Sequence, residues 1–102
     1  MKFWVPLSTA EEIVAVFQKR LKFSSLPGVV TMTVRPGENA FAVTLRSGRV
    51  SVLSFLVTSE DSGATVTLVD KEVSRAHHTF ITDLSEWIYH HARAIGGRRT
   101  IL

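Results

Sequence analysis

The feature that most constrains the fold is a change of hydrophobic period, from helical spacing to strict alternation and back to helical spacing. Apolar residues recur at helical spacing near each end of the chain, whereas the residues between alternate between apolar and polar. A repeat of about 3.6 residues favours an amphipathic helix, and a repeat of two favours a strand with one buried face. The pattern therefore predicts a sheet flanked in sequence by two helices.

The first helix is expected to begin in residues 8–12, which read STAEE. This run contains two overlapping pairs, Ser8/Glu11 and Thr9/Glu12, at capping-box spacing. One helical face then carries Ala10, Ile13, Val14, Phe17 and Leu21. The turn-forming residues 24–28 are expected to end the helix.

The second helix is expected from Thr79 to Ile95, closed by Gly96 and Gly97. Its apolar face carries Phe80, Leu84, Trp87, Ile88, His91 and Ile95. Such one-sided helices must cover an apolar sheet face.

Four strands joined by short turns are expected between the helices, and a short edge strand at Lys2–Val5 precedes them. The alternating runs are 30–35, 41–46, 49–58 and 64–69. Consecutive strands with short turns form a meander. The predicted fold is α+β: a two-layer sandwich in the order (β)-α-β-β-β-β-α, with both helices on one face of a four- to five-stranded antiparallel sheet.

The alternation slips in the run 49–58, because Val50 and Val52 share one phase and the next apolar residues share the other. Either a bulge near Val52 and Leu53 or burial of both faces would explain the slip. If Val50 and Val52 face the helices, an apolar patch emerges on the open face and predicts a homodimer through the sheet. That interface would consist of Leu53, Phe55, Val57 and Val69.

Composition sets broad limits on the class of protein. The 102 residues include no cysteine, which excludes disulfides and thiolate chemistry, and the net charge is +3. The N-terminal sequence lacks the pattern of a signal peptide, so a cytoplasmic location is expected. Residues 1–95 are expected to form one domain, with 96–102 as a flexible basic tail.

The order of elements over Lys2 to Ile95 resembles the helix-grip and TATA-binding-protein-like folds, including the Bet v 1/START-like lipid-binding proteins and the kinase-associated C-terminal domains. The chain has fewer strands than the START-like pattern, and it lacks the second short helix. The resemblance implies a groove between the C-terminal helix and the sheet.

A histidine in the apolar face of the second helix makes this groove a candidate site. His91 is expected either to be buried or half-buried and hydrogen-bonded to backbone or a side chain, or to be a polar group at the floor of a pocket. In the second interpretation a small apolar or acyl-type ligand is bound without catalysis by His91, Trp87, Phe41 and Ile88. No cofactor is expected.

Neither a metal site nor an enzyme is favoured by the remaining polar residues. The pairs at 77–78 and 90–91 are separated by ~20 Å along a helix, too far to share one ion. Asp83, Glu86 and His90 share a helical face, where a solvated surface is the simpler interpretation. An enzyme is the least favoured class, because no set of nucleophile, base and stabilising group can be assembled.

Basic residues offer a third class of function, weak binding to an anionic lipid surface or to nucleic acid. The candidates are Lys19, Arg20, Lys22, Arg35, Arg46 and Arg49. A simpler interpretation is that the three arginines of the strands are solvated charges that discourage edge-to-edge aggregation.

Overall fold

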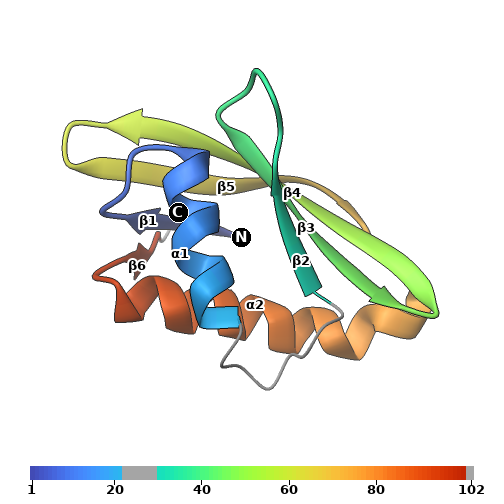
Figure 1. Cartoon of the computed structure of the whole chain (residues 1–102). Helices are drawn as coiled ribbons and strands as arrows, with labels where there is room; N and C mark the ends of the chain where they lie inside the picture. The colour runs from blue at the N-terminus through green and yellow to red at the C-terminus, as the bar shows by residue number, and fades with distance from the viewer. Residues whose placement is uncertain (22–29, 101–102) are drawn as a thin grey trace.

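The computed structural model describes residues 1–21 and 30–100. They form an α+β sandwich, in which both helices cover one face of a six-stranded antiparallel sheet (Figure 1). The predicted fold class and order of elements are confirmed. The elements are β1 (Lys2–Val5), α1 (Ala10–Leu21), β2 (Val30–Val34), β3 (Ala40–Ser47), β4 (Arg49–Glu60), β5 (Gly63–Glu72), the 3₁₀ helix η1 (Arg75–His77), α2 (His78–Ala94) and β6 (Arg98–Arg99).

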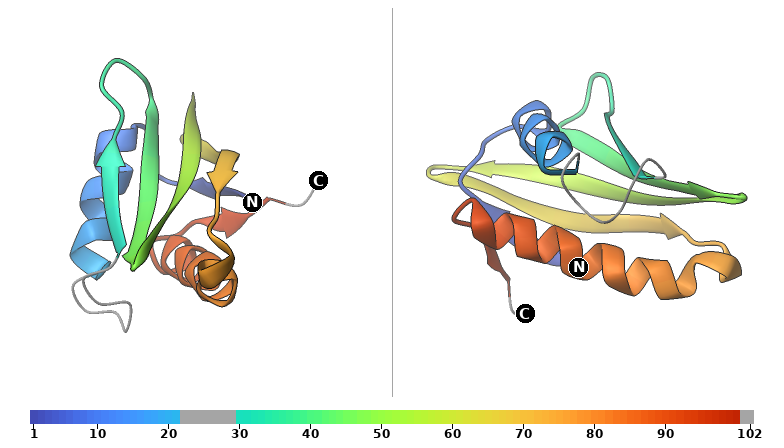
Figure 2. Two further views of the ribbon diagram at one scale, coloured as in Figure 1. Left: turned by 90° about the vertical axis from the view of Figure 1, so that its right-hand side faces the viewer. Right: turned by 60° about the horizontal axis from the view of Figure 1, so that its bottom comes forward.

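The sheet order is β2-β3-β4-β5-β1-β6. Strands β2 to β5 form the predicted meander, and α2 runs back opposite in direction to β5 (Figure 2). The proline-terminated sequence of β1 suggests an edge strand, but β1 is not at the edge of the sheet. It lies between β5 and β6, because Arg98 and Arg99 fold back and pair with its outer side.

Helix α1 starts at the second of the two predicted capping boxes. The backbone N–H of Glu12 donates to Oγ1 of Thr9 at 3.2 Å, which satisfies one of the free N–H groups of the first turn. The N–H of Ala10 donates to Oδ1 of Asn39 at 2.8 Å, and the Asn39 amide donates to the carbonyl of Val57 at 3.0 Å. Asn39 thus fixes the start of α1 to the sheet. The predicted helix end at 24–28 lies outside the described residues.

The core fills the space between the helices and the sheet with aromatic and aliphatic side chains. Phe41 and Phe55 are stacked with their ring centroids 5.0 Å apart, and Phe3 meets Phe55 edge-on at 6.5 Å. Ile13 and Phe17 of α1 are fully buried in this core. Burial of each such side chain stabilises the fold by about 1.5–3 kcal/mol.

Strand β4 alternates regularly, contrary to the slip that the sequence suggests near Val52. Its helix-facing residues are Ser51, Leu53, Phe55 and Val57, each no more than 4% exposed. The prediction that Leu53, Phe55 and Val57 emerge on the open face is wrong, because the outward positions belong to Val50 and Val52. The hydrophobic pattern changes phase only because a polar residue, Ser51, occupies an inward position.

The bulge lies in β5 rather than in β4. Ser54 pairs with Asp70 and Phe55 pairs with Leu68, which leaves Val69 as an extra residue on β5. Val69 is 59% exposed. Of the four residues of the predicted interface, it is the one that is exposed as expected. Because directly paired residues point to the same face of a sheet, the bulge puts Lys71 on the helix side, opposite Leu53.

The inward Ser51 is held by a buried histidine. Its Oγ lies 2.6 Å from Nδ1 of His77 and accepts the backbone N–H of Ser74 at 2.9 Å. Nε2 of His77 lies 3.2 Å from the carbonyl oxygen of Ser47. All these groups are satisfied when the ring is neutral, with Nε2–H donating to Ser47 and Nδ1 accepting from the Ser51 hydroxyl. The set joins the β3–β4 hairpin to the start of α2.

The composition of residues 96–102 predicts a flexible tail. Up to Thr100, the last described residue, the chain beyond Gly96 is instead hydrogen-bonded to α2 and β1. The N–H of Gly97 donates to the carbonyl of Ala92 at 2.7 Å, and that of Thr100 donates to Lys2 at 3.1 Å. Close approach to α2 and β1 requires glycine at 97, because a Cβ there would lie 2.5 Å from the Trp4 carbonyl oxygen.

Two arginines of β6 are held by aromatic rings. The guanidinium of Arg98 lies over Trp4, 4.9 Å from the ring centroid, and that of Arg99 lies over Tyr89 at 3.8 Å. Arg99 also forms an ion pair of 3.5 Å with Glu86. Cation–π contacts of this kind contribute about 0.5–1 kcal/mol at exposed sites. The basic residues predicted to be mobile are therefore part of the sheet.

Candidate functional site

A hollow of about 460 Å³ lies between the end of β5 and the first turns of α2. Its lining residues are Lys71, Val73, His78 and Ile81. We refer to it as the α2 groove. Val73 and Ile81 are half-buried, whereas Lys71 and His78 are exposed, so the hollow has apolar walls and a polar rim.

The bulge at Val69 creates this combination of side chains. If Val69 paired regularly with β4, the alternation of Val66 and Leu68 would continue to Asp70 on the helix side. With it, Asp70 faces outward and the next residue, Lys71, points toward α2. On the other wall, His78 and Ile81 are three residues apart in α2 and so share one helical face.

The volume of the α2 groove falls within the range of small-molecule sites, and the groove is open to solvent. Ligand sites usually enclose about 300–1,000 Å³, with apolar walls and a few polar groups that orient the ligand. The ammonium group of Lys71 offers a point charge for an anion, and the imidazole of His78 offers a hydrogen-bond donor. The arrangement suits a molecule with an apolar body and an acidic end.

The four residues predicted to bind a ligand do not share one hollow. Phe41 and Ile88 are each 2% exposed and belong to the core, so neither can line an open groove. Trp87 and His91 are half-buried and lie together on α2, with ring centroids 4.5 Å apart. The apolar face of α2 predicts burial correctly for Leu84 and Ile88, whereas Phe80 is 46% exposed. The sheet fills most of the space beneath this face.

His91 fits the first of its two predicted interpretations, a half-buried and hydrogen-bonded histidine. Nη1 of Arg20 lies 3.3 Å from Nδ1 of His91, so the guanidinium can donate to a neutral ring. Burial lowers the pKa of His91 below its ordinary value, and the charges of Arg20 and His90 lower it further. The indole N–H of Trp87 nearby is buried and has no acceptor among the described residues. The surroundings of His91 are thus cationic.

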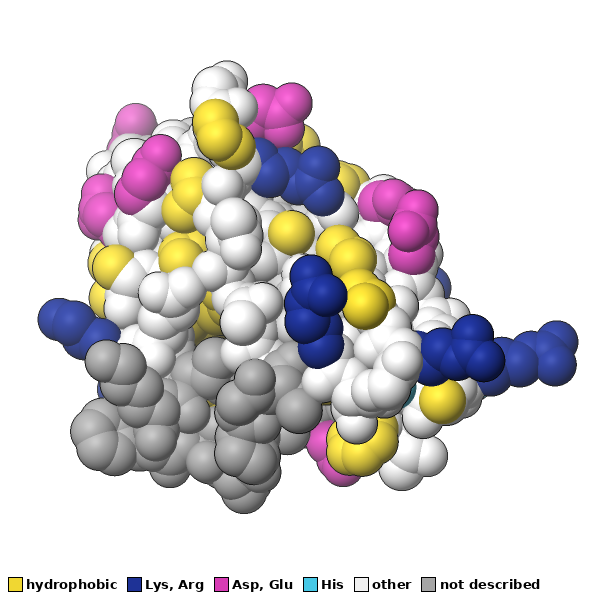
Figure 3. Space-filling view, turned by 45° about the vertical axis from the view of Figure 1, so that its right-hand side comes forward, with side chains coloured by type: hydrophobic (Ala, Val, Ile, Leu, Met, Phe, Trp, Pro, Cys, Tyr) yellow, Lys and Arg dark blue, Asp and Glu magenta, His cyan; other side chains and the backbone are white. Residues whose placement is uncertain are grey.

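The predicted basic residues do not form one patch. Lys19 and Arg20 lie in the last turn of α1, whereas Arg35 follows β2 and Arg46 is near the tip of the β3–β4 hairpin with Arg49. Lys22 lies outside the described residues. On the surface shown in Figure 3, basic side chains alternate with acidic and small apolar ones, so no large field of one sign forms there.

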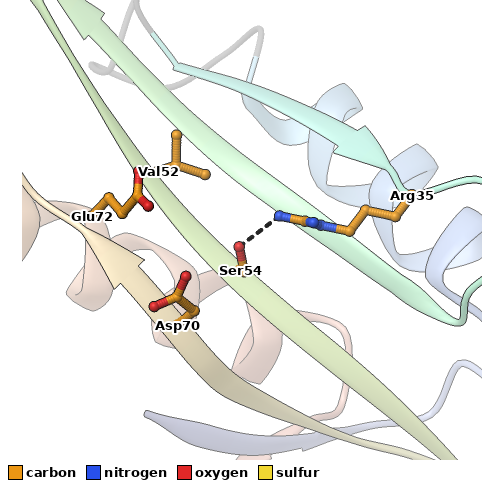
Figure 4. Close-up of a pocket in the computed structure, with 5 residues that line it drawn as sticks. All are labelled: Arg35, Val52, Ser54, Asp70 and Glu72. Carbon is orange, nitrogen blue, oxygen red and sulfur yellow. Dashed lines mark hydrogen bonds between the residues drawn. The ribbon is translucent and has the colours of Figure 1, made fainter.

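The open face of the sheet carries shallow hollows on either side of β4. Figure 4 shows one of about 110 Å³, lined by Arg35, Val52, Ser54, Asp70 and Glu72. The guanidinium of Arg35 donates to Oγ of Ser54 at 2.7 Å, while Asp70 and Glu72 approach from β5. Opposite charges therefore lie on the two sides of β4, with Val52 and Ser54 between them.

No group of three or more histidine, aspartate or glutamate side chains that could hold a metal ion occurs in 1–21 and 30–100. Within the same residues, neither helix combines the length and the apolar character needed to cross a membrane.

Comparison of the chain with protein-family models, with curated proteins and with solved structures finds no significant match.

Sequence reasoning missed the residues of the α2 groove. Residues 68–73, LVDKEV, contain a signal for Lys71. Up to Leu68 the even-numbered residues of β5 point toward the helices, whereas beyond Val69 the odd-numbered Lys71 does so. For His78 and Ile81 no such signal exists, because their position opposite β5 depends on the turn through η1.

Proposed function

We propose that this chain is a non-enzymatic binding domain, which holds a small amphiphilic acid in the α2 groove. The ligand has an acyl chain or another apolar body, and it ends in a carboxylate or a similar anion. The observation that carries the proposal is the hollow of about 460 Å³, in which Val73 and Ile81 form apolar walls beside the ammonium group of Lys71. The apolar body would contact the walls, and the acid group would meet Lys71 and His78 at the rim.

A binding role fits the polar residues better than catalysis does. Ser51 and His77 are the kind of pair that a nucleophilic enzyme uses, with 2.6 Å between Oγ and Nδ1. Both residues, however, are only 1% exposed, and their remaining hydrogen-bonding groups are occupied by backbone atoms. A substrate cannot reach this hydroxyl, so the pair stabilises the fold instead.

Three ten-carbon probes with different head groups test the proposal: decanoate, decanol and decyltrimethylammonium. Isothermal titration calorimetry below the critical micelle concentration should give the order decanoate, then decanol, with the cation weakest. Amide shifts on addition of decanoate should centre on Val73, His78 and Ile81 in ¹⁵N spectra. Equal affinity for the anionic and cationic probes, or shifts centred elsewhere, would contradict the proposal.

Two substitutions separate the head group from the apolar wall. Lys71→Gln should weaken decanoate about three- to tenfold, as expected for an exposed ion pair, and leave decanol unchanged. Ile81→Trp should fill the hollow and weaken both probes. Arg93→Gln is the matched control, because it removes one positive charge at the far end of α2, ~22 Å along the helix from His78. If the control weakened decanoate as much as Lys71→Gln, the attraction would come from net charge and not from the groove.

A further inference from the structure

The outward row of β4 forms an apolar strip through the open face of the sheet. The strip consists of Val50, Val52, Ser54 and Leu56, and Val50 and Leu56 are 50% and 45% exposed. Large aliphatic side chains exposed in a row on a sheet are characteristic of a surface that another protein covers. Both helices lie on the other face of the sheet, so no described helix covers the strip.

Charges of opposite sign flank the strip at the same height along β4. On the side of β2, the guanidinium of Arg35 reaches Oγ of Ser54. On the side of β5, Asp70 is the direct pairing partner of Ser54, and Glu72 is that of Val52. Within residues 1–21 and 30–100, Arg35 forms no ion pair with either carboxylate; the ion pair found there joins Arg99 and Glu86.

This arrangement is self-complementary. A two-fold axis in the plane of the interface, directed along β4, would exchange the β2 side of one copy with the β5 side of the other. Arg35 of each copy would then face Asp70 of its partner, and the apolar strips would meet along the axis. We propose that the open face is a homodimer interface, in which a second copy of this chain pairs through the Arg35–Asp70 contact made twice.

A second copy is the occupant that the charges favour. An isologous interface needs a charged group to meet its complement from the same surface, and a cation on one side of a central strand with a carboxylate on the other meets that requirement for Arg35 and Asp70. In two sheets packed face to face, the mean strand directions differ by about 30°. A two-fold axis tilted slightly away from the direction of β4 gives such an angle between the two copies. The α2 groove lies on the opposite side of the sheet, so the dimer and the proposed ligand site do not compete.

The area of the face predicts a weak dimer. Neighbouring strands are spaced by ~4.8 Å and residues along a strand by ~3.3 Å. The five residues of β2 and eight residues of each of β3, β4 and β5 therefore cover roughly 460 Å² in projection, or roughly 900 Å² counted over both copies. An interface of that size lies at the lower end of specific complexes, where association is transient. Micromolar concentrations are therefore the range in which the dimer should be sought.

A charge exchange between two variants is the decisive test, because the same contact occurs twice. In Arg35→Asp, residue 35 would face the partner's native carboxylate at 70, and in Asp70→Arg two cations would meet. Sedimentation velocity from micromolar to millimolar protein should show a dimer for the wild type, with each variant weakened at least tenfold. An equimolar mixture of the two variants should dimerise again, since every contact then joins opposite charges. The double variant should recover in the same way.

Arg93→Asp is the control, with the same change of charge on an exposed residue of α2; its dimer should match that of the wild type. Circular dichroism of each variant confirms that the fold is retained. Monomers at all concentrations of wild-type protein would overturn the proposal. So would a dimer that neither substitution weakens, or a mixture that stays monomeric.

Discussion

Oγ of Ser51 and Nδ1 of His77 lie 2.6 Å apart in the interior, each in a residue only 1% exposed. The serine comes from the middle of the sheet, and the histidine comes from η1, 26 positions later. Their contact explains two features at once: the polar residue that interrupts the apolar pattern of β4, and the fixed start of α2.

Ser51→Ala should therefore destabilise the fold by about 1–3 kcal/mol, because the substitution leaves Nδ1 of His77 and the N–H of Ser74 buried without partners. Urea unfolding followed by tryptophan fluorescence measures the loss. Ser62→Ala, in the exposed β4–β5 turn, is the control and should change the free energy of unfolding by less than about 0.5 kcal/mol. Equal effects of the two substitutions would show that the buried hydroxyl is dispensable.

Gly63 should tolerate a side chain less well than Gly48. A Cβ at 63 would lie 2.2 Å from the carbonyl oxygen of Val5 and 2.7 Å from Cζ2 of Trp4. At 48 nothing lies within 4 Å, and only the positive φ of 72° opposes alanine. Gly48→Ala is therefore expected to destabilise the fold by about 1 kcal/mol, and Gly63→Ala by about 2–3 kcal/mol or more. Denaturant midpoints in the opposite order would contradict the packing of β1 on the β4–β5 turn.

The strongly periodic parts of the sequence were predictable because their signals are local. The helical spacing around Phe17 and Ile88 and the alternation around Val43 each place the buried face correctly. A regular repeat needs no knowledge of a distant partner. The resemblance to helix-grip and TATA-binding-protein-like folds stays a prediction.

The remainder depends on partners far away in the sequence. An inward Ser51 is acceptable only because its hydroxyl forms a hydrogen bond with Nδ1 of His77, and nothing in the neighbouring residues indicates that contact. The prediction that Leu53 lies on the open face is wrong for this reason, because it requires the polar Ser51 to face water. The prediction of a site around His91 misses the α2 groove for a related reason: the groove depends on Lys71 pointing toward α2, and the unpaired Val69 interrupts the alternation of β5 before that residue.

The pKa of His91 should rise when the positive charge of Arg20 is removed. Burial, the Arg20 guanidinium and His90 all hold this pKa below the ordinary value of 6.5. In the unfolded chain the ring takes up a proton near pH 6.5, whereas in the folded chain it does so only at lower pH. Acidification through this window therefore favours the unfolded state, and the contribution of His91 to stability is complete only above pH 6.5.

Titration of the imidazole Hε1 resonance by NMR tests this prediction. Arg20→Gln should shift the transition of His91 toward higher pH, and the stability of that variant should fall less steeply on acidification. Lys19→Gln is the matched control, because it removes a neighbouring charge of α1 without breaking the contact of 3.3 Å between Arg20 and His91. A His91 transition that is the same in wild type and in Arg20→Gln would rule out the assigned cause.

Deletion of Val69 should be tolerated, although it removes a residue from the middle of a strand. Ser54 pairs with Asp70 and Phe55 with Leu68, so Val69 has no partner on β4. Its removal closes the bulge and leaves the phase on either side unchanged, with Asp70 outward and Lys71 toward α2. We expect a folded protein that has lost less than about 2 kcal/mol of stability.

Deletion of Ser54 from the facing strand is the contrast. Leu53 and Phe55 would become neighbours, and both cannot point inward, because side chains alternate along a strand. One large apolar side chain, or every inward residue on one side of the deletion, would be exposed to water. This deletion should lower the free energy of unfolding by more than about 3 kcal/mol, as removal of a buried phenylalanine side chain does. Amide spectra and urea midpoints of the two deletion variants measure the difference, and equal damage from both would mean that Val69 is an integral member of the β4–β5 ladder.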